Sequence, residues 1–438
     1  MAVDSYSGSG NPEGWRAPVA SAPLDAHLVI PGSKSLTNRE LVLSALADSP
    51  STIDAPLVAR DTTLMADALR ALGTTIDASS PTTWQIAPGA FHGGATIDAG
   101  LAGTVMRFIP PVAALADGPV TIDGDAHARN RPMATTIDAL RLLGVAVDDD
   151  GRGSLPFTIH GNGMVEGGEL TIDASASSQF VSGLLLAAPR FRDGLVLRHA
   201  GERLPSLPHI EMTIATLARR GVTVTSPKPA TWVVAPGPIA GTTMPIEPDL
   251  SNAGPLLAAA LLAGGRVTIA GWPDETTQVG DLFATLLPRF GATVTRSADG
   301  LTVDGGDGFR GGQTWAGVDL DLSEGGELAP TFAALAALAT SGSRITGIGH
   351  LRGHETDRLA ALVSEINGLG GRVSELPDGL AFEPAPLHGG PWAAYADHRM
   401  ATTGALLGLV VDGVVVDDIG TTAKTLPEFP ELWQELLG

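Results

Sequence analysis

The chain has 438 residues, of which 44% are hydrophobic and 17% are charged, and its formal net charge is −21. This length predicts two or three domains with large cores. So acidic a protein is a poor general binder of nucleic acid or anionic membrane surfaces, and the absence of Cys excludes disulfides, thiolate nucleophiles and Cys-ligated metals. We therefore expect a cytoplasmic protein with no nucleic-acid or membrane partner.

Residues 1–21 are rich in Ser, Gly and Pro and show no hydrophobic periodicity. A segment of this composition lacks the apolar surface that a packed element requires. We therefore expect a flexible N-terminal tail over these residues.

The stretch Leu28–Ala47 (LVIPGSKSLTNRELVLSALA) predicts a strand end, a turn and a helix. A Pro-Gly pair breaks the apolar run, and Ser33 then stands where it can cap a helix with apolar residues at helical spacing. Lys34 and Arg39 lie near the start of this helix, together with the hydroxyl of Ser35. Helix dipole, backbone N–H groups and cations together predict an anion-binding site, although the spacing is not that of a Walker loop.

One pattern, an extended segment followed by a polar turn and an Ala/Leu-rich helix, recurs along the chain at intervals of roughly 70–75 residues. The six turns are Pro31–Ser35, Asp98–Thr104, Asp173–Gln179, Glu247–Gly254, Asp321–Leu328 and Tyr395–Met400. A second helix ending at Gly, followed by short β runs, makes each copy roughly βαβαββ. These second helices are predicted at Thr62–Gly73, Met133–Gly144, Ile210–Gly221, Val279–Gly291 and Arg358–Gly370.

Three copies per domain predict two α/β domains of similar build. The prolines that flank Ile246 mark the expected crossover. We expect residues 33–246 to form the first domain and residues 22–32 plus 247–438 the second, which the chain's first strand completes. The helix-start turns are expected to face one cleft between the domains, an expectation that rests partly on the resemblance described below.

The starts of the predicted helices carry both cations and carboxylates. Two carboxylates, Glu327 and Glu355, stand among these cations, and such neighbours set protonation states for acid–base chemistry. The pattern predicts an anionic substrate with several phosphate or carboxylate groups. The cations are Lys34, Arg39, Arg107, Arg131, Arg358, Arg399 and Lys424.

Eight motifs occur in order along the chain: PGSKSLTNR, LAGTVMRF, RNRPM, SSQF, SLPHIEMT, HETDR, DHRM and AKT. Each is weak alone, but together they resemble the 5-enolpyruvylshikimate-3-phosphate (EPSP) synthase family from about Leu28 to Trp433. The resemblance implies a two-domain inside-out α/β barrel with six βαβαββ repeats, three in each domain. It also implies transfer of the enolpyruvyl group of phosphoenolpyruvate to the 5-hydroxyl of shikimate 3-phosphate, through a tetrahedral intermediate that releases phosphate. No metal or organic cofactor is implied, and we expect a monomer.

The resemblance also implies roles for individual residues. Glu327 matches the proton acceptor for the attacking hydroxyl and Glu355 the residue that protonates the phosphoenolpyruvate methylene, with Lys34 and Lys424 as the other catalytic residues. The residues implied around phosphoenolpyruvate are Lys34, Gly103, Arg131, Gln179, Arg358, Arg399 and Lys424. Those implied around shikimate 3-phosphate are Lys34, Ser35, Arg39, Ser177, Ser178, Gln179, Ser206, Glu327 and His354.

Some residues depart from the family's commoner pattern and are similar to its actinobacterial branch. They are Glu327 for Asp, His354 for Lys, His350 for Asn, His209 for Tyr and Leu101 for Asn. The sequence leaves the roles of the three His residues open between site and surface. Gly103 keeps the small residue of the glyphosate-sensitive class, so we predict that glyphosate inhibits the protein.

Three other functions share part of this pattern. A UDP-N-acetylglucosamine enolpyruvyl transferase normally carries a Cys on a mobile loop, which this chain lacks. An RNA-end-modifying enzyme of similar architecture would need a basic surface, and a non-catalytic repeat scaffold has no reason to gather cations and carboxylates in the same turns. The remaining charge, including the acidic run 148–150, is expected to be solvated surface.

Overall fold

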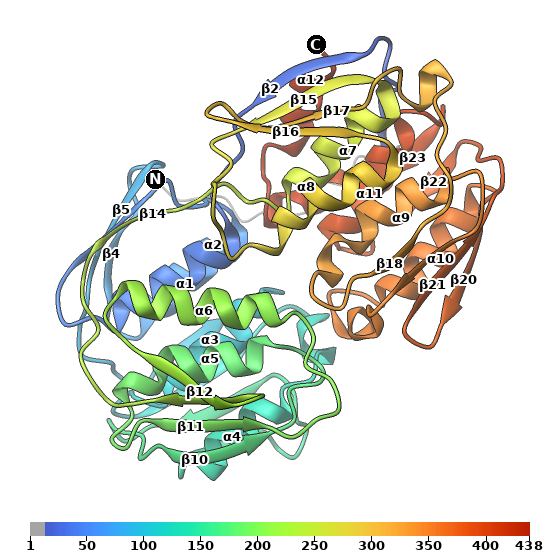
Figure 1. Ribbon diagram of the computed structural model, residues 1–438. Helices are drawn as coiled ribbons and strands as arrows, with labels where there is room; N and C mark the ends of the chain where they lie inside the picture. Colours follow the sequence, from blue (N-terminus) through green and yellow to red (C-terminus); the bar gives the residue numbers. More distant parts are fainter. Residues whose placement is uncertain (1–13) are drawn as a thin grey trace. The chain divides into compact units, whose positions relative to one another are not determined.

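The computed structural model describes residues 14–438, which form two compact units (Figure 1). The N-terminal unit contains Pro31–Leu250 and Pro273–Val279. The C-terminal unit contains the described residues up to Ile30, Ser251–Trp272 and Gly280–Gly438. The segment Pro273–Val279 therefore groups with the first half of the chain. That the units act as the domains expected from the sequence stays a prediction.

The N-terminal unit has three four-stranded sheets with one common topology. In each sheet, one parallel pair of strands is followed by two antiparallel pairings, in the orders β14-β3-β5-β4, β6-β7-β9-β8 and β10-β11-β13-β12. The strands are β3 (Ser51–Asp54), β4 (Thr75–Asp77), β5 (Thr83–Ala87), β6 (Thr96–Asp98), β7 (Pro119–Asp123), β8 (Ala146–Asp148), β9 (Phe157–His160), β10 (Gly168–Ile172), β11 (Leu195–His199), β12 (Val224–Lys228), β13 (Thr231–Val234) and β14 (Thr243–Pro245).

The C-terminal unit repeats this topology in the sheets β16-β17-β15-β2 and β18-β19-β21-β20. Its third sheet, β1-β23-β22, has three strands: the sixth copy of the repeat has its second helix, α12 (Phe429–Leu437), but within residues 14–438 no hairpin follows it, and β1 pairs antiparallel with β23 instead. The strands are β1 (Trp15–Arg16), β2 (Leu24–Leu28), β15 (Gly265–Ala270), β16 (Thr293–Ser297), β17 (Gly300–Asp304), β18 (Asp319–Asp321), β19 (Ser343–Thr346), β20 (Arg372–Leu376), β21 (Gly379–Glu383), β22 (Gly390–Trp392) and β23 (Val414–Val416).

The first long strand of the chain completes the C-terminal unit, as the sequence predicts. Strand β2 pairs in parallel with β15, with Leu24 opposite Gly265 and Leu28 opposite Ile269. In the N-terminal unit, β14 takes the corresponding place beside β3. These two pairings leave α1 at the start of the N-terminal unit, and the expected domain crossover stays a prediction.

The predicted flexible tail over residues 1–21 needs correction. Residues 1–13 lie outside the described residues, but Trp15 and Arg16 pair with β23 in antiparallel register. The N–H of Ala17 donates to the carbonyl of Val414, and Ala17 and Ala20 are buried. Composition alone does not predict this strand, because its pairing partner β23 lies about 400 residues later in the chain.

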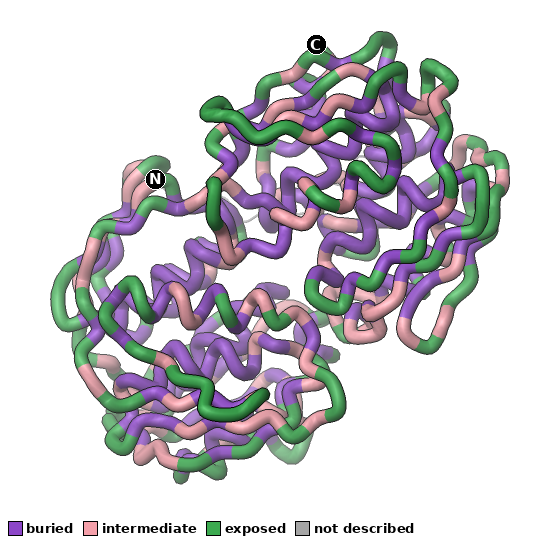
Figure 2. The backbone as a smooth tube through the Cα atoms, viewed as in Figure 1, coloured by how far each residue is buried: buried purple, intermediate pink, exposed green. Residues whose placement is uncertain are grey.

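The helices lie inside each unit and the sheets lie outside. Figure 2 shows α3, α5, α7 and α9 as mostly buried. Strands such as β6 alternate exposed and buried residues. Helices rich in Ala and Leu on all sides have no polar face to turn toward water, which favours this arrangement. The helices are α1 (Lys34–Ala45), α2 (Arg60–Ala71), α3 (Gly103–Ala113), α4 (Ala134–Leu142), α5 (Gln179–Ala187), α6 (Leu207–Arg219), α7 (Ala253–Ala263), α8 (Phe283–Leu286), α9 (Ala329–Ala337), α10 (Arg358–Gly368), α11 (His398–Gly408) and α12 (Phe429–Leu437).

The predicted second helix over Val279–Gly291 is not continuous. The structure has a 3₁₀ turn at Val279–Leu282, the short α8, and a second 3₁₀ turn at Leu287–Phe290. Pro288 has no N–H to donate and disfavours helical geometry at the residue before it, which accounts for the break. Within residues 14–438, no helix is long and apolar enough to cross a membrane.

Candidate functional site

Helix α1 begins with the turn that the sequence predicts. The Ser33 hydroxyl accepts a hydrogen bond from the N–H of Leu36 at 3.5 Å, which confirms the predicted cap. The N–H of Lys34 donates to Asp249 at 3.0 Å, and its ammonium lies 3.3 Å from a carboxylate oxygen of Asp61. Two carboxylates thus hold Lys34 at the positive end of the helix dipole. Its side chain is 19% exposed, so the ammonium can still reach a ligand.

Three side chains converge on Gly103, the first residue of α3: one from α3 itself, one from the start of α5 and one from the turn before α4. A Cβ placed on this glycine would lie 3.0 Å from Oε1 of Gln179, 3.2 Å from Nη2 of Arg131 and 3.3 Å from Nη1 of Arg107. Arg131 is 8% exposed, and one of its N–H groups donates to the carbonyl of Leu101 at 3.1 Å. The structure therefore brings together Gly103, Arg131 and Gln179, and their contact with one substrate, which the family resemblance implies, stays a prediction.

Arg39 has a different environment from the other predicted ligands. It is 1% exposed and donates to the hydroxyl of Thr213 at 2.8 Å, to the carbonyl of His209 at 2.9 Å and to the carbonyl of Ser35 at 2.9 Å. Its guanidinium also lies 5.2 Å from the ring centroid of Phe108. These contacts tie α1 to α6. Contact of Arg39 with a substrate stays a prediction.

Three of the four predicted Ser ligands of the N-terminal unit stand at the starts of α5 and α6, and Ser35 is the second residue of α1. The Ser177 hydroxyl accepts from the N–H of Gln179 at 3.2 Å, and Ser178 is the residue that precedes α5. Ser206 precedes α6 with a left-handed φ of 53°. Such strain at a residue that is not Gly concentrates at functional sites. Helices α1, α3, α5 and α6 pack on one another.

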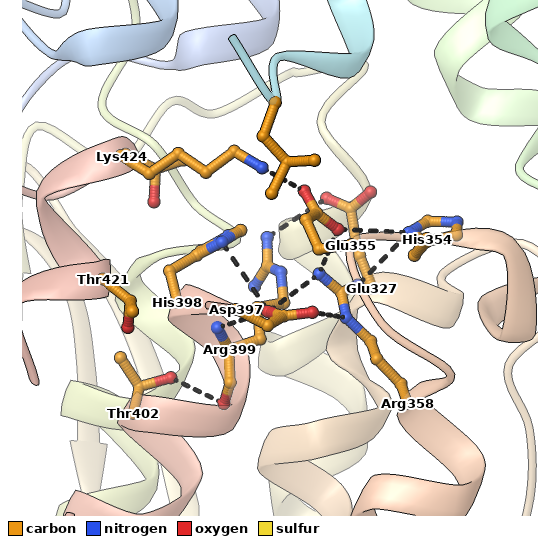
Figure 3. Close-up of polar contacts among 12 residues, drawn as sticks. Glu327, His354, Glu355, Arg358, Asp397, His398, Arg399, Thr402, Thr421 and Lys424 are labelled. Atoms are coloured by element: carbon orange, nitrogen blue, oxygen red, sulfur yellow. Dashed lines mark hydrogen bonds and ion pairs between the residues drawn. The ribbon is translucent and has the colours of Figure 1, made fainter. Parts of the chain in front are cut away.

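In the C-terminal unit, Arg358 and Asp397 form the buried centre of a second cluster (Figure 3). Arg358 donates from Nε to Oδ2 of Asp397 at 2.7 Å and from Nη2 to Oδ1 at 3.1 Å. Their side chains are 2% and 0% exposed. Asp397 also accepts from the N–H of Arg399 at 2.9 Å and so caps α11.

The carboxylate of Glu355 joins this buried pair to Lys424. Arg358 donates from Nη2 to Oε2 of Glu355 at 3.0 Å, and the ammonium of Lys424 donates to Oε1 at 2.5 Å (Figure 3). Burial alone lowers the pKa of Arg358, but the charges of Asp397 and Glu355 and the hydrogen bonds to Asp397 outweigh burial. The pKa of Arg358 therefore stands above its ordinary value, and the guanidinium is a permanent cation.

Glu327 lies at the edge of the same cluster. The hydroxyl of Ser251 donates to Oε1 of Glu327 at 2.6 Å, and Nη2 of Arg399 lies 3.8 Å from the same oxygen. Arg399 also donates to the carbonyl of Ser251 at 3.2 Å. The side chain of Glu327 is 19% exposed, compared with 8% for Glu355, so the two carboxylates have different access to solvent.

His354 contacts the cluster through Arg358. Its Nδ1 lies 3.3 Å from Nη1 of Arg358, and because a guanidinium only donates, Nδ1 accepts in this pair. The ring of His350 lies edge-on to His354, with centroids 5.7 Å apart. The structure therefore places both His residues beside the cluster, which the sequence left open.

Several polar residues of these clusters had no role assigned from the sequence. Asp397 belongs to the quoted motif DHRM, and its position one residue before a helix was the available signal for a cap. Asp61 and Ser251 contact Lys34 and Glu327, respectively, from segments distant in sequence, so no local pattern identifies them. Among residues 14–438, no group of His, Asp or Glu side chains is arranged to hold a metal ion.

The comparisons with known proteins show the family of the chain. A sequence profile of the EPSP synthase family, described as 3-phosphoshikimate 1-carboxyvinyltransferase, matches residues 19–433. The chain belongs to the EPSP synthase family. As a member of this family it is an enzyme, a transferase of the shikimate pathway of aromatic amino-acid biosynthesis.

Individual relatives of this EPSP synthase family member cover nearly the whole chain. A 3-phosphoshikimate 1-carboxyvinyltransferase of Kocuria rhizophila is 56% identical over 437 residues, 97% of this chain and 96% of the relative. The solved EPSP synthase of Acinetobacter baumannii has a TM-score of 0.77 at 22% identity and covers 97% of both chains. The enolpyruvyl transferase NikO of Streptomyces tendae has a TM-score of 0.74 at 18% identity and covers 95% of this chain and 96% of its own. The two structures confirm the predicted fold class.

Proposed function

We propose that the residues described above catalyse transfer of the enolpyruvyl group of phosphoenolpyruvate to the 5-hydroxyl of shikimate 3-phosphate, with release of phosphate. The observation that carries this assignment of roles is the Lys424–Glu355–Arg358 chain of contacts, with Glu327 held close by through Arg399. In this arrangement, two carboxylates lie among three cations of the C-terminal unit. The carboxylates are those of Glu327 and Glu355, and the cations are Arg358, Arg399 and Lys424. Membership of the EPSP synthase family supports the reaction itself.

Phosphoenolpyruvate is bound by the cations. Arg131, Gln179 and Gly103 converge in the N-terminal unit, and Arg358 and Lys424 are linked in the C-terminal unit. Lys34 and Arg399 complete this set. We also propose that the cations of the N-terminal unit and those of the C-terminal unit bind the same substrate molecule. Arg gives planar, bidentate contacts to phosphate and carboxylate, so it fits the two anionic groups of this substrate.

Shikimate 3-phosphate is bound mainly by hydroxyl groups at helix starts. Ser177 and Ser178 at α5 and Ser206 at α6 lie where the backbone N–H groups of a helix favour a phosphate. Lys34, Ser35, Arg39 and Gln179 complete this set in the N-terminal unit. Glu327 and His354 of the C-terminal unit contact the sugar-like ring at the reacting hydroxyl.

The acid–base steps are assigned to Glu355 and Glu327. Glu355 gives a proton to the phosphoenolpyruvate methylene, which makes the adjacent carbon electrophilic, and Lys424 exchanges protons with it through their hydrogen bond. Glu327 accepts the proton of the attacking 5-hydroxyl, and its hydrogen bond from Ser251 fixes the orientation of the carboxylate. The tetrahedral intermediate then loses phosphate by cleavage of its C–O bond, while a proton of the new methyl group returns to Glu355, so that the C=C bond of the enolpyruvyl group re-forms. The surrounding cations stabilise the leaving phosphate.

Phosphate release tests the proposal directly. The purified protein is mixed with phosphoenolpyruvate and shikimate 3-phosphate in buffer with excess EDTA, and phosphate is measured over time. We expect turnover without added metal in the wild type and a loss of about 10³-fold or more in Lys34→Ala. Turnover that requires UDP-N-acetylglucosamine in place of shikimate 3-phosphate, or no turnover with either acceptor, would contradict the proposal. A cytoplasmic location, a monomeric state and the absence of nucleic-acid binding stay predictions.

A further inference from the structure

The turn between β22 and α11 contains two consecutive left-handed residues that are not glycine. Tyr395 has a φ of 55° and Ala396 a φ of 53°. A Cβ disfavours this conformation because it crowds the following carbonyl group. Two such residues in succession persist only where their surroundings hold them, and they adjoin Asp397 at the centre of the C-terminal cluster. The strain therefore has a specific consequence for where Asp397 lies.

Carboxylates from two neighbouring elements hold this turn. Glu365 of α10 uses both oxygens: Oε2 accepts from the N–H of Ala393 at 2.8 Å, and Oε1 accepts from the phenol of Tyr395 at 2.6 Å. On the other side, Asp417 accepts from the N–H of Ala394 at 2.8 Å. Hydrogen bonds to an ionised carboxylate are stronger than neutral ones, so this arrangement opposes relaxation of the strained backbone.

This strained turn also determines the position of Asp397. Its N–H donates to the carbonyl of Ala394 at 2.9 Å, and its fully buried carboxylate receives two hydrogen bonds from Arg358. Arg358 contacts Glu355, which contacts Lys424. The hydrogen bonds of Glu365, the backbone of residues 393–397 and the contacts of Asp397 thus link the phenol of Tyr395 to the groups that the proposed function assigns to phosphoenolpyruvate (Figure 3 shows the part of this path from Asp397 onward).

We propose that Glu365 and Tyr395 are positioning residues for the reaction. They hold the strained turn so that Asp397 keeps Arg358, and through it Glu355, in place for phosphoenolpyruvate. The inference rests on the proposed function of these groups. Neither Glu365 nor Tyr395 needs to touch a substrate for this role.

The hydrogen bond between Tyr395 and Glu365 is expected to persist throughout the neutral pH range. The hydrogen bond to Glu365, with burial and the nearby negative charges of Glu365 and Asp417, raises the pKa of Tyr395 above its ordinary value. The phenol therefore keeps its proton and stays a donor throughout the neutral range. Tyr395 is 39% exposed, so removal of its hydroxyl leaves no cavity, and the fold can tolerate the change.

The test compares Tyr395→Phe with the wild type in steady-state kinetics for each substrate and in thermal unfolding. We expect the KM for phosphoenolpyruvate to rise and kcat to fall, each by about fivefold, because Arg358 and Glu355 lose their fixed position. The KM for shikimate 3-phosphate should stay within about twofold and Tm within about 2 °C, because the Ser ligands lie on other helices and the hydroxyl is exposed. A merely structural role would not separate the two KM values.

A second variant, Ala396→Gly, relieves the backbone strain at the left-handed residue 396. Glycine adopts a left-handed φ without crowding, so Ala396→Gly added to Tyr395→Phe should restore much of the lost kcat/KM for phosphoenolpyruvate. Ala230→Gly is the matched control, because Ala230 has a φ of 52° in the N-terminal unit, away from these contacts. It should leave the kinetics of Tyr395→Phe unchanged.

The outcomes separate this inference from the proposed function. If the wild type releases phosphate and Tyr395→Phe has unchanged kinetics for both substrates, the positioning role is wrong and the proposed function stands. Equal effects on both KM values, or equal rescue by Ala230→Gly and Ala396→Gly, would also overturn the positioning role. If the wild type releases no phosphate, the proposed function fails first. Glu365→Gln, which keeps one acceptor oxygen, should give a smaller change of the same kind as Tyr395→Phe.

Discussion

The ammonium of Lys424 donates a hydrogen bond of 2.5 Å to Glu355, although the two residues are 69 positions apart in the chain. The side chains are 7% and 8% exposed, so the contact is largely shielded from water. In such surroundings each partner depends on the other, because a buried charge without its counter-ion is costly. The pair is therefore the part of the site where single substitutions are most informative.

Glu355→Gln keeps the size of the side chain and removes its proton-transfer capacity. We expect kcat to fall by about 10²–10⁴-fold, the range typical of a lost general acid. The KM for shikimate 3-phosphate should change little. The measurement is phosphate release at saturating substrates. Glu375→Gln provides a matched control, since Glu375 pairs with Arg352 outside the cluster, and this control should retain wild-type turnover.

Gly103→Ala adds one methyl group where three side-chain ends converge. The new Cβ would lie 3.0 Å from Oε1 of Gln179 and 3.2 Å from Nη2 of Arg131, closer than ordinary packing allows. These side chains must shift by a few tenths of an ångström, so we expect the KM for phosphoenolpyruvate to rise by about tenfold. Thermal stability should change little, because the displaced atoms are the ends of flexible side chains.

Glyphosate inhibition tests the same position with a different ligand. We expect glyphosate to compete with phosphoenolpyruvate in the wild type and to bind at least about tenfold more weakly in Gly103→Ala. The measurement is the inhibition pattern at several concentrations of phosphoenolpyruvate. Absence of competition in the wild type would refute the predicted sensitivity.

The buried pair of Glu40 and Arg220 should dominate the stability of the N-terminal unit. Arg220 donates to Oε2 of Glu40 at 2.9 and 2.6 Å and also to the hydroxyls of Ser44 and Ser51. Arg220→Met leaves Glu40 buried without its cation, and we expect a loss of about 3–5 kcal/mol at pH 7. Denaturant unfolding measures it. Adding Glu40→Leu to Arg220→Met should recover part of this loss.

The pH dependence of Arg220→Met follows from the titration of Glu40. Burial raises the pKa of Glu40 above its ordinary value of 4.5 more than Arg220 lowers it. For a carboxyl group with a raised folded pKa, the stability it contributes is present below the unfolded pKa and is lost as pH rises through the folded pKa. Arg220→Met raises this pKa further, so the variant should lose less stability near pH 4.5 than at pH 7. A loss independent of pH would contradict this account.

Asp149 should contribute stability that is lost in acid. Its hydrogen bond from Arg141, with those from the N–H groups of Gly153 and Gly151, lowers its pKa from 3.8 to about 2. A depressed pKa contributes stability above the unfolded value, and that stability is lost as pH falls from 3.8 toward 2. Asp149→Asn should therefore lower stability by about 1 kcal/mol at neutral pH, and the difference from wild type should shrink in this acid range. The neighbouring Asp148→Asn, at an exposed position, should have no such effect.

Local sequence signals predicted most of the fold. Ser33 caps α1 as expected. Of the prolines around Ile246, Pro245 is the last residue of β14, and Pro248 comes shortly before Leu250, where this segment of the N-terminal unit ends. The return of β2 to β15 also agrees with the sequence. The cap and the proline turn depend on chemistry that neighbouring residues determine, whereas the return of β2 was expected partly from the family resemblance.

Features that depend on distant partners were missed or wrong. The strand at Trp15 needs β23, and Asp149 turns inward from an acidic run that composition alone assigns to the surface. The buried role of Asp397 appears only once α10 lies beside α11. Likewise, the contacts of Arg39 with Thr213 and His209 could not be seen in the sequence, while its contact with a substrate stays a prediction. In each case, long-range packing decides what the side chain does.

The most direct test of the central claim is a crystal structure of the enzyme with shikimate 3-phosphate and glyphosate bound. The account predicts one site in which Lys34 and Arg131 of the N-terminal unit and Lys424 of the C-terminal unit contact the same bound anion, with Glu355 within hydrogen-bonding distance of Lys424. Ligands that contact only one unit, or anions that leave Lys34, Arg131 and Lys424 in bulk solvent, would contradict it.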